Sequence, residues 1–255
     1  MHSLFHFPRR CAVTASRCST LKIMSTKTQE RDMSDWYRQV MESPPKCLEY
    51  VKQNAVQGDP RSVLDAIEAF ALKNPMMNVG PRKGEVVDNA IRNKAPRTMV
   101  ELGAYTGYST VRFASVQREV VGSENSHYYS FEFSPEFAEI VREMVAFAGL
   151  SNQVTVITGA FADRFKDVLA GKTVDMYFID HEKSCYLPDA KLMIESGTLA
   201  KGSLLVADNV LRPGAPDYLE YIQNHSQFSS QLHEVELTYH GNTWVDGVLI
   251  AEYKA

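Results

Sequence analysis

The chain has 255 residues, of which 44% are hydrophobic, and its formal net charge is −4. This length and hydrophobic content suit one α/β domain of ordinary size with a full core. The acidic balance argues against a nucleic-acid partner, and no apolar stretch is long enough to cross a bilayer as a helix.

Residues 1–34 are expected to lie outside the folded domain. Residues 1–29 are rich in Ser, Thr and Arg and contain no Asp or Glu. This composition is typical of a mitochondrial transit peptide, and a disordered tail is the alternative. The cysteines show neither a disulfide framework nor metal-ligand spacing, which favours a reducing compartment. We therefore expect a cytoplasmic protein, with mitochondrial import as the alternative, whose domain covers residues 35–255.

Three helical patterns precede the first predicted strand. Apolar residues recur at roughly helical spacing over residues 35–51, with an interruption at Pro44 and Pro45. Further amphipathic patterns follow Pro60 and Gly84. Because these helices come before the first strand, we expect them to lie over one end of the sheet as a lid.

Strands and helices then alternate, which predicts a doubly wound, mostly parallel seven-stranded sheet. Ser134 and Pro135 offer an N-cap and a first-turn proline to the helix after the second strand. The last two β-rich runs are joined by the short segment His240–Thr243, which implies a C-terminal antiparallel hairpin. The predicted strands are Thr98–Leu102, Tyr128–Phe133, Val154–Ile157, Val174–Ile179, Ser203–Ala207, Leu232–Tyr239 and Val245–Tyr253.

The first predicted strand ends in a glycine turn. Ligands of an open α/β sheet bind outside the carboxyl ends of its strands, and here Glu101, Gly103 and Gly107 form the pattern E-x-G-x-x-x-G. Glycine lets the backbone approach a ligand closely, although such a turn can also be a mere connection. The spacing differs from the dinucleotide pattern G-x-G-x-x-G. Glu132, at the end of the second strand, either accepts both hydroxyls of a ribose or serves the dipole of the helix that begins at Pro135.

A second polar cluster follows two neighbouring strands. Asp180 and Asp208 stand one helix plus one strand apart, and with Asn209 they offer three hard oxygen ligands suited to Mg²⁺. The alternative is that each Asp caps a helix. Lys183 reaches the same space, where a divalent cation favours its neutral form and lets it act as a general base. His181 either packs against a cofactor base or is a structural histidine.

An ordered set of segments matches one known family. These segments are Met77–Gly80, Lys83-Gly84, Glu101–Tyr105, Gly107–Ser109, Asp180-His181 with Lys183, Tyr186–Asp189, Ala207–Val210, Pro213–Asp217 and Val245–Gly247. Through them the chain resembles the catechol O-methyltransferase family, collinearly from about Asp35 to the C-terminus. The ordered set is specific, whereas the glycine turn alone fits any methyltransferase of this class.

The resemblance implies a Rossmann-like methyltransferase fold and Mg²⁺-dependent methyl transfer from S-adenosylmethionine to one hydroxyl of a catechol-like substrate. It implies that the methionine part of the cofactor is surrounded by Val79, Glu101, Gly103, Tyr105 and Ser109. Glu132 would hold the ribose, with Phe133 and His181 beside the adenine. The expected partner is this small-molecule substrate, and the chain is expected to act as a monomer.

The resemblance also assigns the metal and the acceptor. Asp180, Asp208 and Asn209 would bind Mg²⁺, with Asp180 also next to the cofactor and Asn209 next to the substrate. Met77 and Pro213 would border the acceptor ring. Lys183 would contact the substrate and take its proton.

The chain departs from the family in its predicted pocket. The family usually has tryptophans at the places of Pro75 and Glu182, a Ser-Gln pair at residues 161–162, and a substrate-contacting glutamate at Thr243, with Asp246 close by in this chain. Two alternatives to a catechol enzyme therefore stay open. One is a metal-dependent O-methyltransferase for bulkier diphenols of the flavonoid or caffeoyl type, and the other is a non-catalytic S-adenosylmethionine binder.

Overall fold

The computed structural model describes residues 19–239 and 242–255. The chain divides into two compact units, Met1–Gln39 and Val40–Ala255. Helix α1 (Ser19–Asn54) begins inside the segment 1–34 that we expected to precede the domain. The first 18 residues lie outside the described part, so targeting by this segment stays a prediction. None of the helices in the described residues is long and apolar enough to cross a membrane.

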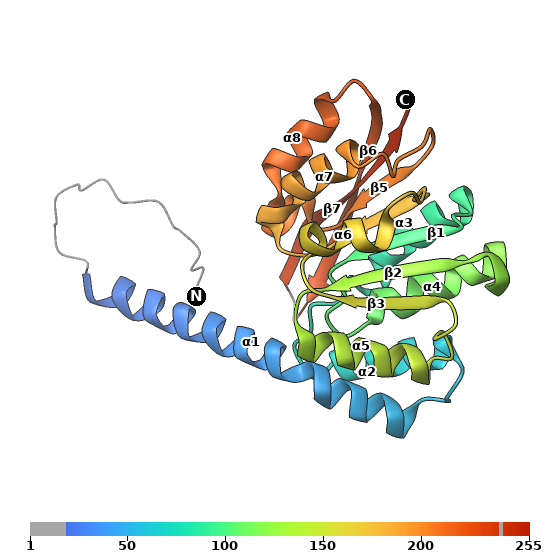
Figure 1. The fold of residues 1–255 in the computed structure, drawn as a ribbon. Coiled ribbons are helices and arrows are strands. Elements are labelled where there is room, and N and C mark those ends of the chain that lie inside the picture. Colours follow the sequence, from blue (N-terminus) through green and yellow to red (C-terminus); the bar gives the residue numbers. More distant parts are fainter. Residues whose placement is uncertain (1–18, 240–241) are drawn as a thin grey trace. The chain divides into compact units, whose positions relative to one another are not determined.

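The described residues of the second unit form a seven-stranded sheet in the order β3-β2-β1-β4-β5-β7-β6 (Figure 1). Strands β1 to β5 pair in parallel, and β7 pairs antiparallel with both β5 and β6. The mostly parallel sheet with a C-terminal antiparallel hairpin is thereby confirmed. The strands are β1 Thr98–Leu102, β2 His127–Glu132, β3 Val154–Thr158, β4 Met176–Ile179, β5 Leu204–Ala207, β6 Phe228–Tyr239 and β7 Asn242–Tyr253.

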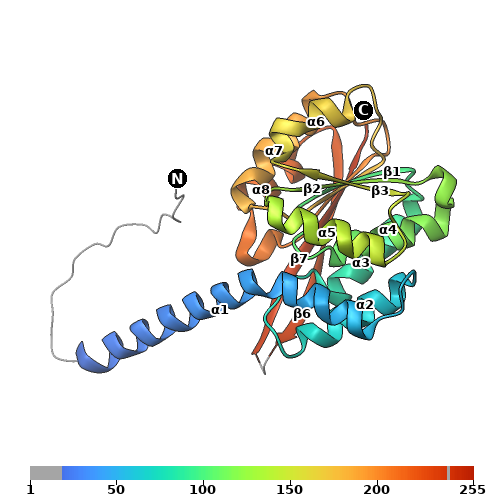
Figure 2. The ribbon, with the colours of Figure 1, turned by 60° about the horizontal axis from the view of Figure 1, so that its bottom comes forward.

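Helices cover both faces of this sheet, with two separate cores (Figure 2). Because side chains alternate along a strand, Met99 of β1 enters one core and Val100 the other. Residues 40–54 of α1 and helices α2 to α5 build the first core, and α6 to α8 build the second. The helices after α1 are α2 Pro60–Ala71, α3 Gly80–Lys94, α4 Tyr108–Val121, α5 Pro135–Phe147, α6 Phe161–Leu169, α7 Tyr186–Glu195 and α8 Pro216–Asn224.

Helices α2 and α5 start at the local signals of the sequence, whereas α3 begins at Gly80, before the predicted start after Gly84. Asp59 caps α2 by accepting hydrogen bonds from the backbone N–H groups of Arg61 and Ser62, at 2.9 and 3.2 Å. Ser134 caps α5 in the same way, and Pro135 occupies its first turn. These caps explain why both helices begin where the sequence predicted.

The predicted interruption of the first helix at Pro44 and Pro45 is wrong, because α1 runs through both residues. Val40, Cys47 and Val51 on this helix are fully buried. Packing of this face therefore outweighs the loss of two backbone N–H donors.

Some strand boundaries also differ from the prediction. β4 begins at Met176 instead of Val174, and the Asp175 side chain just before it accepts the N–H groups of Arg97 and Thr98, at 2.8 and 2.9 Å. β2 ends at Glu132, whose carboxylate accepts the N–H of Ser134 beyond it.

The hairpin is longer than predicted, since β6 begins at Phe228 and β7 at Asn242. Asn242 and Thr243 are thus strand residues, because the antiparallel ladder extends to the pairs Thr238 with Thr243 and Tyr239 with Asn242. Residues 240–241, within the predicted connection His240–Thr243, lie outside the described part.

Candidate active site

The switch point of the sheet lies between β1 and β4, where the strand order reverses. The turn after β1 has a left-handed backbone at Gly103 (φ +90°) and at Tyr105 (φ +53°). The N–H groups of Ala104 and Tyr105 donate to Oε2 of Glu132, at 3.1 and 2.9 Å, and the N–H of Ser134 donates to Oε1 at 2.9 Å. Glu132 thus braces the turn and the start of α5, as the helix-dipole reading expected. A carboxylate accepts about four hydrogen bonds, so a ribose hydroxyl can still be accommodated.

Glu101, inside β1, is fully buried directly below this turn. Its Oε2 accepts from the hydroxyls of Thr110 and Ser130, whereas its Oε1 has no partner among the described residues. Burial raises the pKa of Glu101 to about 7, against the opposing effect of hydrogen bonds from Ser109, Thr110 and Ser130. A buried carboxylate oxygen without a partner is costly unless a donor or cation meets it. This position therefore suits the ammonium group of an amino-acid ligand.

Gly103 is where the turn after β1 meets the turn after β4. A Cβ atom on Gly103 would lie 2.5 Å from the carbonyl oxygen of Asp180 and 2.9 Å from Cα of His181. Both of these neighbours are backbone atoms, which cannot rotate away. The close approach of the two turns therefore requires glycine at this position.

We expect Gly103→Ala to lower the melting temperature strongly. The left-handed backbone alone costs about 1–3 kcal/mol for a non-glycine residue, which in a chain of this size corresponds to about 2–12 °C. The contact with Asp180 adds to that loss. Gly197→Ala is the matched control, because Gly197 has φ +73° and open space where the Cβ would lie. Thermal unfolding that finds equal losses for the two variants would show that the turns are not in tight contact.

The predicted metal residues follow two adjacent strands. Ile179 of β4 pairs with Ala207 of β5, so Asp180 and Asp208 come next to each other at the same edge. Asn209 follows in a left-handed conformation with φ +55°. The structure thus brings together Asp180, Asp208 and Asn209, which the sequence predicted to share a site.

The chemistry of these three side chains fits a hard cation. Asp208 is fully buried, and its Oδ1 has no partner among the described residues. Burial, together with the charge of Asp180, raises the pKa of Asp208 to about 7, although Lys83 opposes this rise. In the described part of the chain, no three His, Cys, Asp or Glu side chains form a metal-binding group. The candidate set instead consists of two carboxylates and one amide.

A buried lysine joins this cluster, in a role that the sequence pattern did not indicate. Lys83 of α3 is 4% exposed, and its Nζ donates to Oδ2 of Asp208 and to Oδ2 of Asp246, both at 2.8 Å. Burial alone would lower the pKa of Lys83, but the charges of Asp208 and Asp180 and the hydrogen bonds to Asp208 and Asp246 raise it. The lysine lay in a family-like segment, yet only the fold brings α3, β5 and β7 together around it.

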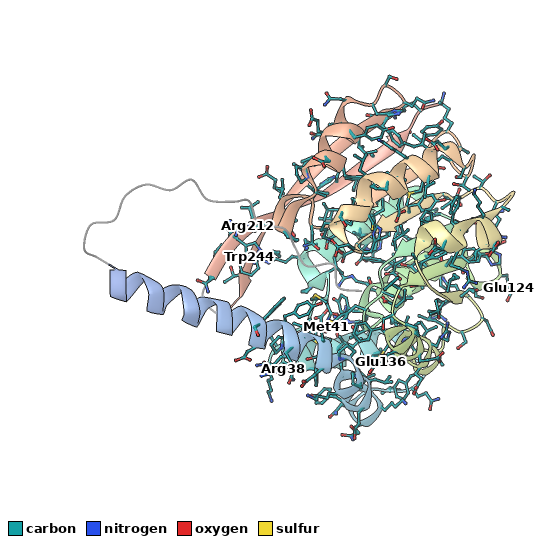
Figure 3. All side chains as sticks on the ribbon, turned by 60° about the vertical axis from the view of Figure 1, so that its left-hand side comes forward. Arg38, Met41, Glu124, Glu136, Arg212 and Trp244 are labelled. Carbon is teal, nitrogen blue, oxygen red and sulfur yellow. The ribbon has the colours of Figure 1, made fainter. Side chains whose placement is uncertain are left out.

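Asp246 connects this cluster to the segment η3 (Val210–Gly214). Its Oδ2 accepts from Nδ2 of Asn209 at 2.7 Å, and its Oδ1 accepts from the N–H of Arg212 at 2.9 Å. Arg212 directly precedes Pro213 in η3. The segment η3 packs against β7, and Figure 3 labels Arg212 of η3 and Trp244 of β7. Asp246 therefore fixes both a predicted metal ligand and the backbone predicted to border the acceptor.

Lys183 lies at the other side of the cluster. Its Nζ donates to Oδ1 of Asp180 at 2.9 Å, to Oδ1 of Asn209 at 3.4 Å and to the Tyr186 hydroxyl at 2.5 Å. That hydroxyl donates in turn to the carbonyl oxygen of Asp208, at 3.0 Å. The predicted base is thus held beside the side chains of Asp180 and Asn209, and Tyr186 connects it to the backbone of Asp208.

His181 has the environment of a structural histidine. Its ring stacks on Tyr186, with centroids 5.2 Å apart, and its Nε2 lies 2.8 Å from Oδ2 of Asp189. Its Nδ1 is buried without a partner among the described residues. The pairing with Asp189 fixes the ring at the turn after β4, so packing against a cofactor base stays a prediction.

The remaining predicted residues lie around the same edge of the sheet. Val79 is buried at the start of α3, and Ser109 lies in the first turn of α4. Phe133, just after β2, is 77% exposed, and Met77, before α3, is 43% exposed. Exposed rings and thioethers at such an edge are available to cover a ligand. Pro213 lies in η3.

The residues at which this chain is expected to differ from the family lie in different environments. Pro75 is half-buried and Glu182 is exposed. Phe161 is a core side chain that packs against Phe131, so it offers no polar group to a ligand. Thr243 is exposed on β7. Neither Pro75 nor Glu182 therefore supplies the aromatic ring that the resemblance places there.

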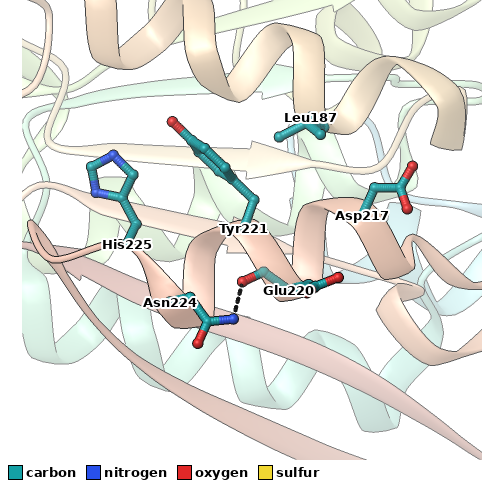
Figure 4. A pocket seen from close by; sticks show the side chains of 6 residues that line it. All are labelled: Leu187, Asp217, Glu220, Tyr221, Asn224 and His225. Carbon is teal, nitrogen blue, oxygen red and sulfur yellow. Dashed lines mark hydrogen bonds between the residues drawn. The ribbon is translucent and has the colours of Figure 1, made fainter.

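A separate, open surface pocket of about 480 Å³ lies between α7 and α8 (Figure 4). Its wall contains none of the predicted site residues, and is formed by Leu187, Asp217, Glu220, Tyr221, Asn224 and His225. The pocket thus lies apart from the cluster at the strand ends.

Known proteins share both the sequence and the fold. A methyltransferase domain family model matches residues 100–210. The chain is 42% identical to the catechol O-methyltransferase of Bos taurus, over 82% of this chain and 76% of that protein. It is 41% identical to the catechol O-methyltransferase B of Danio rerio, over 77% and 74%. The crystal structure of a Bacillus cereus O-methyltransferase in complex with SAH matches the fold with TM-score 0.62 and 22% identity, over 82% and 91%.

The chain belongs to the class of S-adenosylmethionine-dependent O-methyltransferases. This follows from the strand order, from the glycine turn with Glu101 and Glu132 beside it, and from the similarity to these known proteins. Within this class, the chain belongs to the catechol O-methyltransferase family.

Proposed function

We propose that this enzyme transfers the methyl group of S-adenosylmethionine to one hydroxyl of a catechol or catechol-like diphenol, and that Mg²⁺ is bound at Asp180, Asp208 and Asn209. One observation carries the proposal. The Nζ of Lys183 lies within 3.4 Å of both Asp180 and Asn209, and Asp208, whose Oδ1 is buried without a partner among the described residues, directly precedes Asn209. A base and three oxygen ligands therefore converge at the switch point, which suits an acceptor with two adjacent hydroxyls.

Each group has a defined task in this reaction. Mg²⁺ held by the three oxygen ligands supplies positive charge that favours the ionised form of the diphenol. Lys183 takes the proton of the reacting hydroxyl. The hydroxyl oxygen then bonds to the methyl carbon while the sulfur–carbon bond breaks, which leaves the proton on Lys183 and the sulfur neutral.

The cofactor residues contribute orientation. Glu101 offers its buried Oε1 to the methionine ammonium group, and Glu132 offers its remaining lone pairs to the ribose. Glu101 lies in β1 next to the turn between β1 and α4, and Glu132 at the end of β2 accepts the N–H groups of that turn. Holding the methyl donor and the hydroxyl in line makes the transfer nearly unimolecular.

We expect the full chain to methylate catechol only when Mg²⁺ is present. Radiolabelled S-adenosylmethionine, catechol and Mg²⁺ should give a monomethylated product, which EDTA abolishes and excess Mg²⁺ restores. Phenol is the control, because it lacks the second hydroxyl. Turnover that resists EDTA would contradict the metal proposal. Cofactor binding without product from any diphenol would indicate a non-catalytic binder.

A second substrate class is favoured by the pocket wall. Pro75 and Glu182 replace two tryptophans of the family, and Glu182 is exposed. Side chains smaller than tryptophan at these two positions would leave more space for the acceptor. The same assay over diphenols of increasing size separates the two proposals, because a flavonoid or caffeoyl-type enzyme has its highest kcat/KM with the bulkier acceptors.

A further inference from the structure

The two carboxylate oxygens of Asp208 lie in different environments. Oδ2 accepts a hydrogen bond from Nζ of Lys83 at 2.8 Å, whereas Oδ1 is buried and has no partner among the described residues. The side chains of Lys83 and Asp208 are 5% and 1% exposed. Water therefore has little access to this ion pair, and the lysine stays on Oδ2. Asp208 consequently presents one oxygen, not two, to the proposed metal site.

The position of Lys83 is itself fixed by a second carboxylate. Its Nζ also donates to Oδ2 of Asp246 at 2.8 Å, and that same oxygen accepts from Nδ2 of Asn209 at 2.7 Å. An amide whose nitrogen is engaged in this way directs its Oδ1 elsewhere, here toward Lys183. Lys83 and Asp246 thus leave one oxygen of Asp208 and one oxygen of Asn209 for a cation.

We propose that Lys83 determines the metal specificity of this enzyme, by holding Asp208 to a single ligand oxygen and thereby favouring Mg²⁺ over Ca²⁺. The proposal rests on the metal site of the proposed function. Mg²⁺ requires near-octahedral geometry with six ligands at about 2.0–2.1 Å. Ca²⁺ takes about six to eight oxygen ligands and often binds a carboxylate through both oxygens. A lysine that occupies the second oxygen therefore removes a ligand that Ca²⁺ uses and Mg²⁺ does not.

The test is the substitution Lys83→Met, which keeps the length of the side chain and removes its charge and its hydrogen bonds. Mn²⁺ is bound to the full chain, and its displacement by Mg²⁺ or by Ca²⁺ is followed by the electron paramagnetic resonance signal of free Mn²⁺. We expect the ratio of Ca²⁺ to Mg²⁺ affinity to rise by at least about tenfold over wild type, because only Ca²⁺ gains from the second carboxylate oxygen, and outer partners of metal ligands change metal affinity by about this factor. The ratio is the decisive readout, because the lost positive charge strengthens binding of both divalent ions.

A double variant separates ligand geometry from charge. Lys83→Met leaves two buried carboxylates without their cation, whereas Lys83→Met with Asp246→Asn removes one charge of each sign and is expected to fold better. Both variants free Oδ2 of Asp208, so both should show the raised ratio. A ratio that returns to the wild-type value in the double variant would show that charge alone is responsible and would overturn the proposal.

A ratio of Ca²⁺ to Mg²⁺ affinity that is unchanged in either folded variant would also overturn the proposal. Lys83 would then have a structural role only, as the partner of Asp208 and Asp246 in a buried ion pair. These outcomes differ from a failure of the proposed function, in which the wild-type chain itself binds neither Mn²⁺ nor Mg²⁺.

Discussion

Asp208→Asn should reduce Mg²⁺-dependent turnover at least about 100-fold while leaving the affinity for S-adenosylmethionine near that of the wild type. Loss of an outer partner alone lowers metal affinity by about 10–100-fold, and Asp208 is a proposed ligand. Asparagine keeps the shape of the side chain, and Asp246 still pairs with Lys83 in this variant. The cofactor carboxylates Glu101 and Glu132 belong to β1 and β2, apart from this change.

Calorimetry with S-adenosylmethionine and a turnover assay measure the two effects separately. Glu132→Gln is the reciprocal control, because it should weaken cofactor binding and leave Mn²⁺ binding unchanged. Cofactor affinity that disappears in parallel with activity in folded Asp208→Asn would show that metal and cofactor sites are not separate. Asp208→Ala is less informative, because removing one partner of a buried ion pair costs about 3–5 kcal/mol of stability.

The position of the site was predictable because strand ends follow from local patterns. Thr98–Leu102 is a short, largely apolar run followed by the glycine turn at Gly103, and the structure has β1 at those bounds. The alternation of strands and helices predicts a parallel sheet, and in such a sheet the carboxyl ends of β4 and β5 share an edge. Asp180 and Asp208 could therefore be placed together without coordinates.

The partners of these residues could not be predicted in the same way. A buried lysine is rare, and Lys83 is recognised only when α3, β5 and β7 come together. The hydrogen bonds from the backbone N–H groups of Ala104 and Tyr105 to Glu132 depend on turn geometry that the glycine pattern does not specify. The continuity of α1 through Pro44 is likewise decided by packing, which overrides local propensity.

Lys183→Met should lower kcat by about 10²–10⁴-fold, the usual contribution of a positioned general base. In the structure its Nζ donates to Asp180, Asn209 and Tyr186, which uses all three hydrogens of an ammonium group. The neutral amine has two hydrogens and one lone pair, so the base form must release one of these contacts. The contact with Asn209 is the longest, at 3.4 Å, and Asn209 is the residue predicted to lie beside the acceptor. The lone pair is therefore expected to face the reacting hydroxyl.

Lys183→Arg distinguishes a proton acceptor from a mere positive charge. A guanidinium group stays protonated at any working pH, so this variant should lose nearly as much kcat as Lys183→Met. The wild-type pH profile of kcat should show a group that must be deprotonated, and this limb should be absent from Lys183→Met. Lys191→Met is the matched control, since Lys191 is exposed on α7 with its Nζ over the ring of Tyr221. Near-normal kcat in Lys183→Arg would mean that Lys183 only positions the hydroxyl, and the assignment of the base would then be wrong although the methyltransferase assignment would stand.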